Sequence, residues 1–158
     1  MKKKSVFLVL CLTISMQIFA YECWTETRKI PSNGILYKDG ACVMSLYLPD
    51  GVNKQNSKYQ QFFDSMSTYI NSTISKVYVL GLTDCLIDME MSVVALSEET
   101  YYVISFITIK YLSPYIFVGL VQTVDASGMT YDQTYTDFNS ARADYDKRCN
   151  KYIALLDK

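Results

Sequence analysis

The stretch that decides the fold runs from residue 86 to residue 124. Residues 86–97 read LIDMEMSVVALS, residues 101–110 read YYVISFITIK and residues 115–124 read YIFVGLVQTV, and the turn sequences SEET and YLSP separate them. In the first segment every second residue from 87 to 95 is apolar, which is the period-two pattern of a β-strand with one wet face. The other two segments are apolar on both faces and need cover on both sides. The stretch therefore predicts a central antiparallel β-meander.

An amphipathic helix is expected on either side of this meander along the chain. Before it, apolar residues recur every three or four positions from Tyr59 to Val77, behind a Ser57-Lys58-Tyr59-Gln60 sequence that is typical of a capping box. After it, a polar loop at residues 125–137 leads into a second helix. The inner stripe of that helix is expected to be Phe138, Ala141, Tyr145, Cys149, Tyr152 and Leu156. Both helices are expected to cover one face of the sheet.

A β-hairpin is predicted at residues 35–48, ILYKDGACVMSLYL, because Asp39-Gly40 favours a two-residue turn between apolar flanks. In that register Tyr37 lies opposite Cys42. The preceding residues 25–34, TETRKIPSNG, are rich in turn formers and are expected to be irregular. The predicted fold class is α+β: an N-terminal β-hairpin, a long amphipathic helix, an antiparallel β-meander of three to four strands and a C-terminal helix.

The first twenty residues have the pattern of a secretory signal peptide. Three lysines at residues 2–4 precede an uncharged run that ends at Ala20 and is short for a membrane span. We therefore expect a signal peptide at 1–20 and a single α+β domain at 21–158. The expected location is extracytoplasmic, either secreted or, in a bacterium, periplasmic.

Charge and hydropathy narrow the range of partners. The chain has 15 Lys+Arg and 16 Asp+Glu, so without the three leader lysines 12 basic residues face 16 acidic ones, a net charge of about −4. This balance argues against a nucleic-acid partner. Residues 101–124 are apolar enough to consider as a membrane span, but Lys110 and Pro114 in the middle favour two strands and a turn. No membrane span is expected after removal of the signal.

Four cysteines follow the leader: Cys23, Cys42, Cys85 and Cys149. An even number in an exported chain predicts two disulfide bonds, and spacing alone leaves three connectivities open. The favoured pairing is Cys23–Cys42 with Cys85–Cys149, which would tie the central sheet to the C-terminal helix. The alternative is that one or more of them are buried free thiols.

Recognisable catalytic motifs are missing from the sequence. The chain has no histidine, which removes Ser-His-Asp and Cys-His catalysis and most zinc sites. We therefore expect no enzyme, no cofactor and no metal. Asp88 and Glu90 share one strand face about 7 Å apart, within the range of paired catalytic carboxylates, but a solvated polar face is the favoured interpretation. Asp125, Asp132 and Asp137 lack the ligand pattern of a calcium loop.

Tyrosine is abundant, with 14 residues in the chain. Its ring is apolar and its hydroxyl is polar, which suits recognition surfaces as well as half-buried cores. The candidate contact surface consists of Tyr101, Tyr111, Tyr115, Tyr131 and Tyr135. Asn71-Ser72-Thr73 is an acceptor sequon, so Asn71 is a candidate for N-glycosylation in a eukaryotic source.

Taken together, these features predict a secreted or periplasmic, non-enzymatic binding or interaction protein. An effector, an inhibitor and an immunity-type module all fit, with an apolar antiparallel sheet and Tyr-rich loops as the contact surfaces. The candidate partners are a protein, including a second copy of the chain in a homodimer, or a small apolar ligand. The alternatives are a carrier of small apolar ligands and, less favoured, a hydrolase that uses Asp88 and Glu90.

Overall fold

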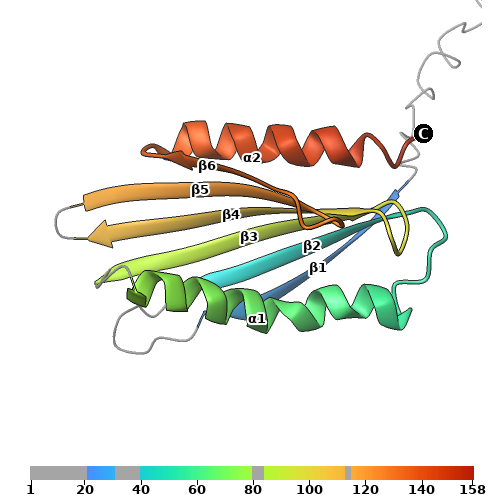
Figure 1. Cartoon of the computed structure of the whole chain (residues 1–158), viewed down its shortest axis with the longest axis horizontal. Coiled ribbons are helices and arrows are strands. Elements are labelled where there is room, and N and C mark those ends of the chain that lie inside the picture. The colour runs from blue at the N-terminus through green and yellow to red at the C-terminus, as the bar shows by residue number, and fades with distance from the viewer. Residues whose placement is uncertain (1–20, 31–39, 80–83, 113–114) are drawn as a thin grey trace, which may run out of the picture.

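The computed structural model describes residues 21–30, 40–79, 84–112 and 115–158. The elements follow in the order β1 (Tyr21–Lys29), β2 (Ala41–Pro49), α1 (Ser57–Val79), β3 (Cys85–Ala95), β4 (Tyr101–Leu112), β5 (Tyr115–Asp125), β6 (Thr130–Tyr135) and α2 (Phe138–Ile153). The strands form a single sheet, and one helix lies on each side of it (Figure 1). Residues 1–20, where the signal peptide is predicted, lie outside the described residues.

The α+β class is confirmed, but the predicted meander of three to four strands is wrong. The sheet has six strands in the order β1-β2-β3-β4-β5-β6, and it is mixed. Four neighbouring pairs are antiparallel, whereas β2 and β3 are parallel. The reason is α1, because the chain crosses back over the sheet through this helix before it enters β3.

The predicted hairpin register is also wrong. Cys42 lies opposite Arg28 of β1 on one side and Met89 of β3 on the other, whereas Tyr37 lies outside the described residues. Residues 21–29, partly expected to be irregular, form the edge strand β1. An edge strand pairs with a neighbour on one side only and buries few of its side chains, so its sequence shows only a weak alternation of apolar and polar residues.

The loop predicted at residues 125–137 contains the sixth strand. β6 pairs with β5 from Thr130 opposite Val124 to Tyr135 opposite Gly119. Five of its six residues are exposed, so the hydrophobic pattern that marks a buried strand is absent. β6 is held by its hydrogen bonds to β5 and by contacts with α2 rather than by burial of its own side chains.

Helix α1 packs on the face of the sheet formed by β2, β3 and β4. Its buried residues are Tyr59, Phe63, Met66, Ile70 and Thr73. They meet the inward side chains of β2 and β3, among them Met44, Leu46, Met89 and Met91. Asn56, rather than the predicted Ser57, caps the helix, because its Oδ1 accepts from the backbone N of Lys58 at 3.2 Å.

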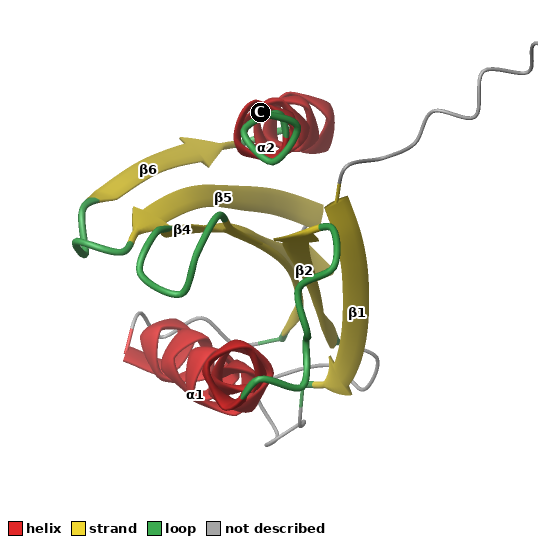
Figure 2. Ribbon diagram, turned by 90° about the vertical axis from the view of Figure 1, so that its right-hand side faces the viewer, coloured by secondary structure: helices red, strands yellow, loops and turns green. Residues whose placement is uncertain are grey.

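Helix α2 covers the opposite face, so the expectation that both helices share one face is wrong (Figure 2). Asp137 caps α2 by accepting from the Ser140 backbone N at 2.8 Å. The predicted inner stripe is confirmed at Ala141, Tyr145, Cys149 and Leu156, which are buried against β4 and β5. Strands β4 and β5 are apolar on both faces because each face meets a different helix.

The predicted disulfide bonds are wrong: Cys23, Cys42, Cys85 and Cys149 are all free. Cys42 and Cys85 lie in the core under α1, whereas Cys149 lies in the core under α2. The sheet therefore separates Cys85 from Cys149. Cys23 pairs in register with Tyr47, five positions along β2 from Cys42, which is about 17 Å of strand.

Candidate functional site

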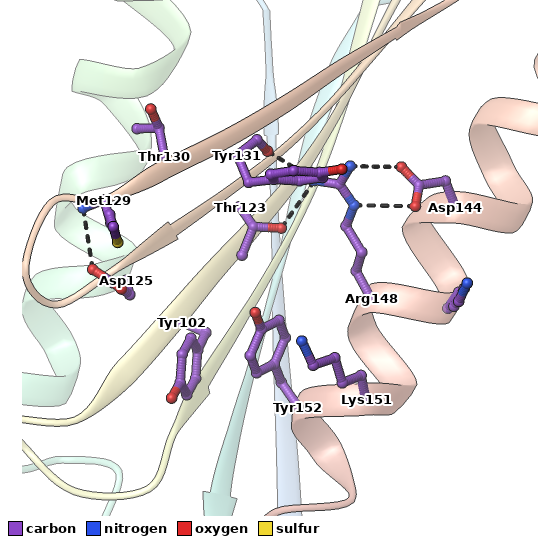
Figure 3. Close-up of a pocket in the computed structure, with 11 residues that line it drawn as sticks. Tyr102, Thr123, Asp125, Met129, Thr130, Tyr131, Asp144, Arg148, Lys151 and Tyr152 are labelled. Carbon is purple, nitrogen blue, oxygen red and sulfur yellow. Dashed lines mark hydrogen bonds and ion pairs between the residues drawn. The ribbon is translucent and has the colours of Figure 1, made fainter.

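A groove of about 680 Å³ lies between the C-terminal half of α2 and the start of β6. Its lining comes from β4, β5, β6, the β5–β6 turn and α2. The lining residues are Tyr102, Thr123, Asp125, Met129, Thr130, Tyr131, Asp144, Lys147, Arg148, Lys151 and Tyr152 (Figure 3). The two walls of the groove are thus α2 and β6, and its floor is formed by β4, β5 and the side chain of Tyr152 from α2.

Arg148 joins the two walls of the groove. This side chain is buried, and its Nη1 donates to the Tyr131 carbonyl at 2.8 Å and to Thr123 Oγ1 at 3.1 Å. On the helix side its Nη2 lies 2.8 Å from Asp144 Oδ2, and its Nε donates to Asp144 Oδ1 at 3.1 Å. The Tyr131 ring lies over the guanidinium, 4.7 Å from Cζ to the ring centre. Arg148 is therefore a structural clamp that links α2 to β5 and β6.

The floor of the groove is aromatic. The rings of Tyr102 and Tyr152 are stacked, with centroids 4.0 Å apart and an interplanar angle of 21°. Both side chains are half-buried, so part of this stacked pair is open to the groove (Figure 3). At the rim, the side chain of Met129 is 74% exposed. An apolar or aromatic ligand body would find a preformed surface here.

Three of the five charged residues that line the groove are basic. Of the two acids, Asp144 is ion-paired with Arg148, and Asp125 accepts from the backbone N atoms of Ser127 and Met129 in its own turn. These turn hydrogen bonds, with the Ser127 hydroxyl first among them, lower the pKa of Asp125. Lys147 and Lys151 form no ion pair with any described residue.

The five predicted contact tyrosines do not lie on one surface. Tyr101 packs edge-on against Phe62 of α1, with ring centroids 5.0 Å apart, and Tyr111 packs against the core on the same side. Tyr135 lies with the core under α2, where burial raises its pKa. Tyr115 is 69% exposed at the start of β5. Of the five, only Tyr131 lines the groove.

The two carboxylates considered for hydrolysis lie in a smaller hollow of about 270 Å³ near the start of α2. Both Glu90 oxygens accept from Arg142 Nη1 at 2.7 Å. Asp88 accepts from the Ala41 backbone N at 3.1 Å, and its Oδ2 lies 3.9 Å from Lys110 Nζ. Each carboxylate thus has a fixed partner, which suits charge compensation on the sheet surface better than proton transfer to a substrate.

The remaining predicted positions are spread over the surface. Asp125 lies at the end of β5, Asp132 within β6 and Asp137 at the cap of α2, and the described residues hold no cluster of metal-binding side chains. Asn71 is exposed on α1, whereas Thr73 of the same sequon is buried. Within the described ranges, no helix has the length and apolarity needed to cross a membrane.

Comparison with known proteins places the chain in no known group. No family model, no curated protein and no solved structure matches it. The groove itself therefore carries the functional argument.

Sequence reasoning missed most residues of the groove. Tyr152 belongs to the predicted inner stripe of α2. Lys147, Arg148 and Lys151 lie in the later turns of this helix, where basic residues also complement the helix dipole. Besides Tyr131, the sequence offers the pair Lys147 and Lys151, because like charges four positions apart on a helix repel each other. This pair indicates a binding site only once the structure places both lysines along the same groove as Tyr102 and Tyr152.

Proposed function

We propose that this chain is a non-enzymatic binding protein whose groove between α2 and β6 receives a small ligand with an apolar body. The observation that carries the proposal is the half-open Tyr102–Tyr152 stack at the bottom of a groove of about 680 Å³. A volume of this order falls within the roughly 300–1,000 Å³ that is usual for small-molecule sites.

The rigidity of the groove supports the proposal. Arg148 contacts α2, β5 and β6 at once, so the walls keep their separation without a ligand. A preformed site loses little conformational entropy on binding and therefore keeps more of the interaction free energy. Met129 in turn supplies a flexible, polarisable rim that adapts to ligands of different shape.

An extracytoplasmic location is part of the proposal and rests on the leader pattern of residues 1–20. Mass spectrometry of the protein recovered from its native source tests it. We expect a mature chain that begins at Tyr21 outside the cytoplasm. An uncleaved chain recovered from the cytoplasm would contradict this part and leave the groove unaffected.

Fluorescence titration with N-phenyl-1-naphthylamine, an uncharged dye that brightens in apolar surroundings, tests the groove. We expect saturable binding by the native chain and roughly tenfold weaker binding by Tyr152→Ala, because one side chain of the stacked floor is lost. Met129→Ala is a second variant, expected to weaken binding about threefold. Its side chain is 74% exposed, so truncation does not threaten the fold.

The matched control is Tyr115→Ala, which removes a tyrosine that is 69% exposed and does not line the groove. Its dye affinity should equal that of the native chain. Absence of saturable binding, or equal losses in Tyr115→Ala and Met129→Ala, would refute the groove as the binding site.

A further inference from the structure

The groove combines an aromatic floor with two lysines that have no acidic partner among the described residues. We infer that its ligand is an amphipathic organic anion, with an apolar body on Tyr102 and Tyr152 and an acidic group held by Lys147 and Lys151. This inference rests on the proposed function, because it assigns a ligand class to the same site.

The spacing of the two lysines supports an anion between them. Residues four apart on a helix lie on one face, with Cβ atoms about 5–6 Å apart, and like charges at this spacing repel each other. Both side chains line the groove, so an acidic group there is within reach of both and removes their repulsion. Lys151 Nζ also lies 5.0 Å from the centre of the Tyr152 ring, which places the charge beside the aromatic floor.

The other charged residues of the groove already have contacts within the chain. Asp144 is ion-paired with Arg148, and Asp125 accepts hydrogen bonds from its own turn. Three basic residues and two acidic ones line the groove, so its local charge is positive, although the whole chain has a net charge of −1. Pairing with the helix dipole explains a lysine in the last turn of α2, but it does not explain why Lys147 and Lys151 both line the groove that holds the half-buried tyrosine stack.

A matched pair of dyes separates this inference from the proposed function. 8-Anilinonaphthalene-1-sulfonate has the same two ring systems as N-phenyl-1-naphthylamine and adds a sulfonate. We expect the native chain to bind the sulfonate dye roughly tenfold more tightly, because the anion gains charge-assisted contacts. The Lys147→Gln/Lys151→Gln variant should lose that preference and keep its affinity for the uncharged dye.

The control is Lys29→Gln/Lys54→Gln, which makes the same change in net charge at exposed lysines that do not line the groove. It should keep the preference for the sulfonate dye. A second pair of probes extends the test beyond dyes: decanoate should displace the bound sulfonate dye, whereas 1-decanol should do so about tenfold less well.

The outcomes are distinct. Equal affinity of the native chain for both dyes, or a preference that survives Lys147→Gln/Lys151→Gln, overturns the inference and leaves the proposed function standing. Failure of both dyes to bind overturns the proposed function and the inference with it. An equal loss of preference in the two double variants attributes it to net charge and also overturns the inference.

Discussion

Replacing Arg148 tests the physical basis of the groove. The side chain is 10% exposed and its partner Asp144 is 21% exposed, and Arg148 also donates to the Tyr131 carbonyl and to Thr123. Arg148→Met keeps most of the length and the apolar stem and removes every one of these polar contacts. It also leaves the Asp144 carboxylate without its cation.

The expected loss follows from these contacts. Removal of one partner of a buried ion pair costs about 3–5 kcal/mol, and each hydrogen bond to a charged group contributes about 1.5–3 kcal/mol, without simple additivity. Because Asp144 keeps partial contact with water, a loss near the lower limit, about 3 kcal/mol in the free energy of unfolding, is expected for Arg148→Met. Urea unfolding followed by circular dichroism measures it.

Hydrogen exchange shows where that loss acts. β6 is paired on one edge only and has little buried surface, so its backbone amides at residues 130–135 should exchange much faster in Arg148→Met than in the native chain. The exchange rates of the β3 amides, at the centre of the sheet, should rise only as far as the lower global stability of the variant requires.

A second substitution and a control make the reasoning refutable. Asp144→Leu added to Arg148→Met removes the orphaned carboxylate, so the double variant should be more stable than the sum of the single losses predicts, by at least about 1 kcal/mol. Arg28→Met, which breaks a more exposed ion pair with Glu26, should cost less than about 1 kcal/mol. If Arg148→Met and Arg28→Met cost the same and β6 exchange is unchanged, Arg148 is not a clamp.

Two further predictions concern the two cores. Gly119→Val should lower the free energy of unfolding by about 1–3 kcal/mol in urea titrations. The reason is that a Cβ at this position would lie 2.9 Å from Ala141 Cβ and 3.1 Å from the Phe117 ring. An unchanged unfolding midpoint would refute the close approach of α2 to β5. Burial raises the pKa of Cys42 from 9.0 to about 11, so the unfolded chain loses the thiol proton at a lower pH than the folded chain does. The free energy of unfolding should therefore fall by at most about 3 kcal/mol as the pH rises from 9 to 11. Unfolding measured across this range should show a shallower decline in Cys42→Ala than in the exposed control Cys23→Ala, and equal slopes would contradict the prediction.

The helices and the three central strands were predictable because their signals are local. The apolar spacing from Tyr59 to Val77 gives one stripe on a helix, and burial of Tyr59, Phe63, Met66 and Ile70 follows from that spacing. The alternation from residue 87 to residue 95 likewise matches β3. Boundaries differ by only a few residues, since fraying and capping rather than the periodic pattern set them.

The edge strands were not predictable in the same way. β1 and β6 have a neighbour on one side only, so their polar residues remain in water and leave no hydrophobic period. The Asp39-Gly40 pair gave a strong hairpin signal, yet β2 pairs with residues 21–29 instead. A two-residue turn contributes little free energy to folding, and the nine paired positions between β1 and β2 contribute more.

What the sequence alone determined is the class of the fold, because the spacing of apolar residues specifies which side of each helix and strand must leave water. What only the tertiary structure decided is which elements become neighbours. The sheet puts Cys85 and Cys149 into separate cores, so the expected disulfides do not form. It also brings Tyr102 beside Tyr152, 50 positions later, and this contact between distant segments creates the aromatic floor of the groove.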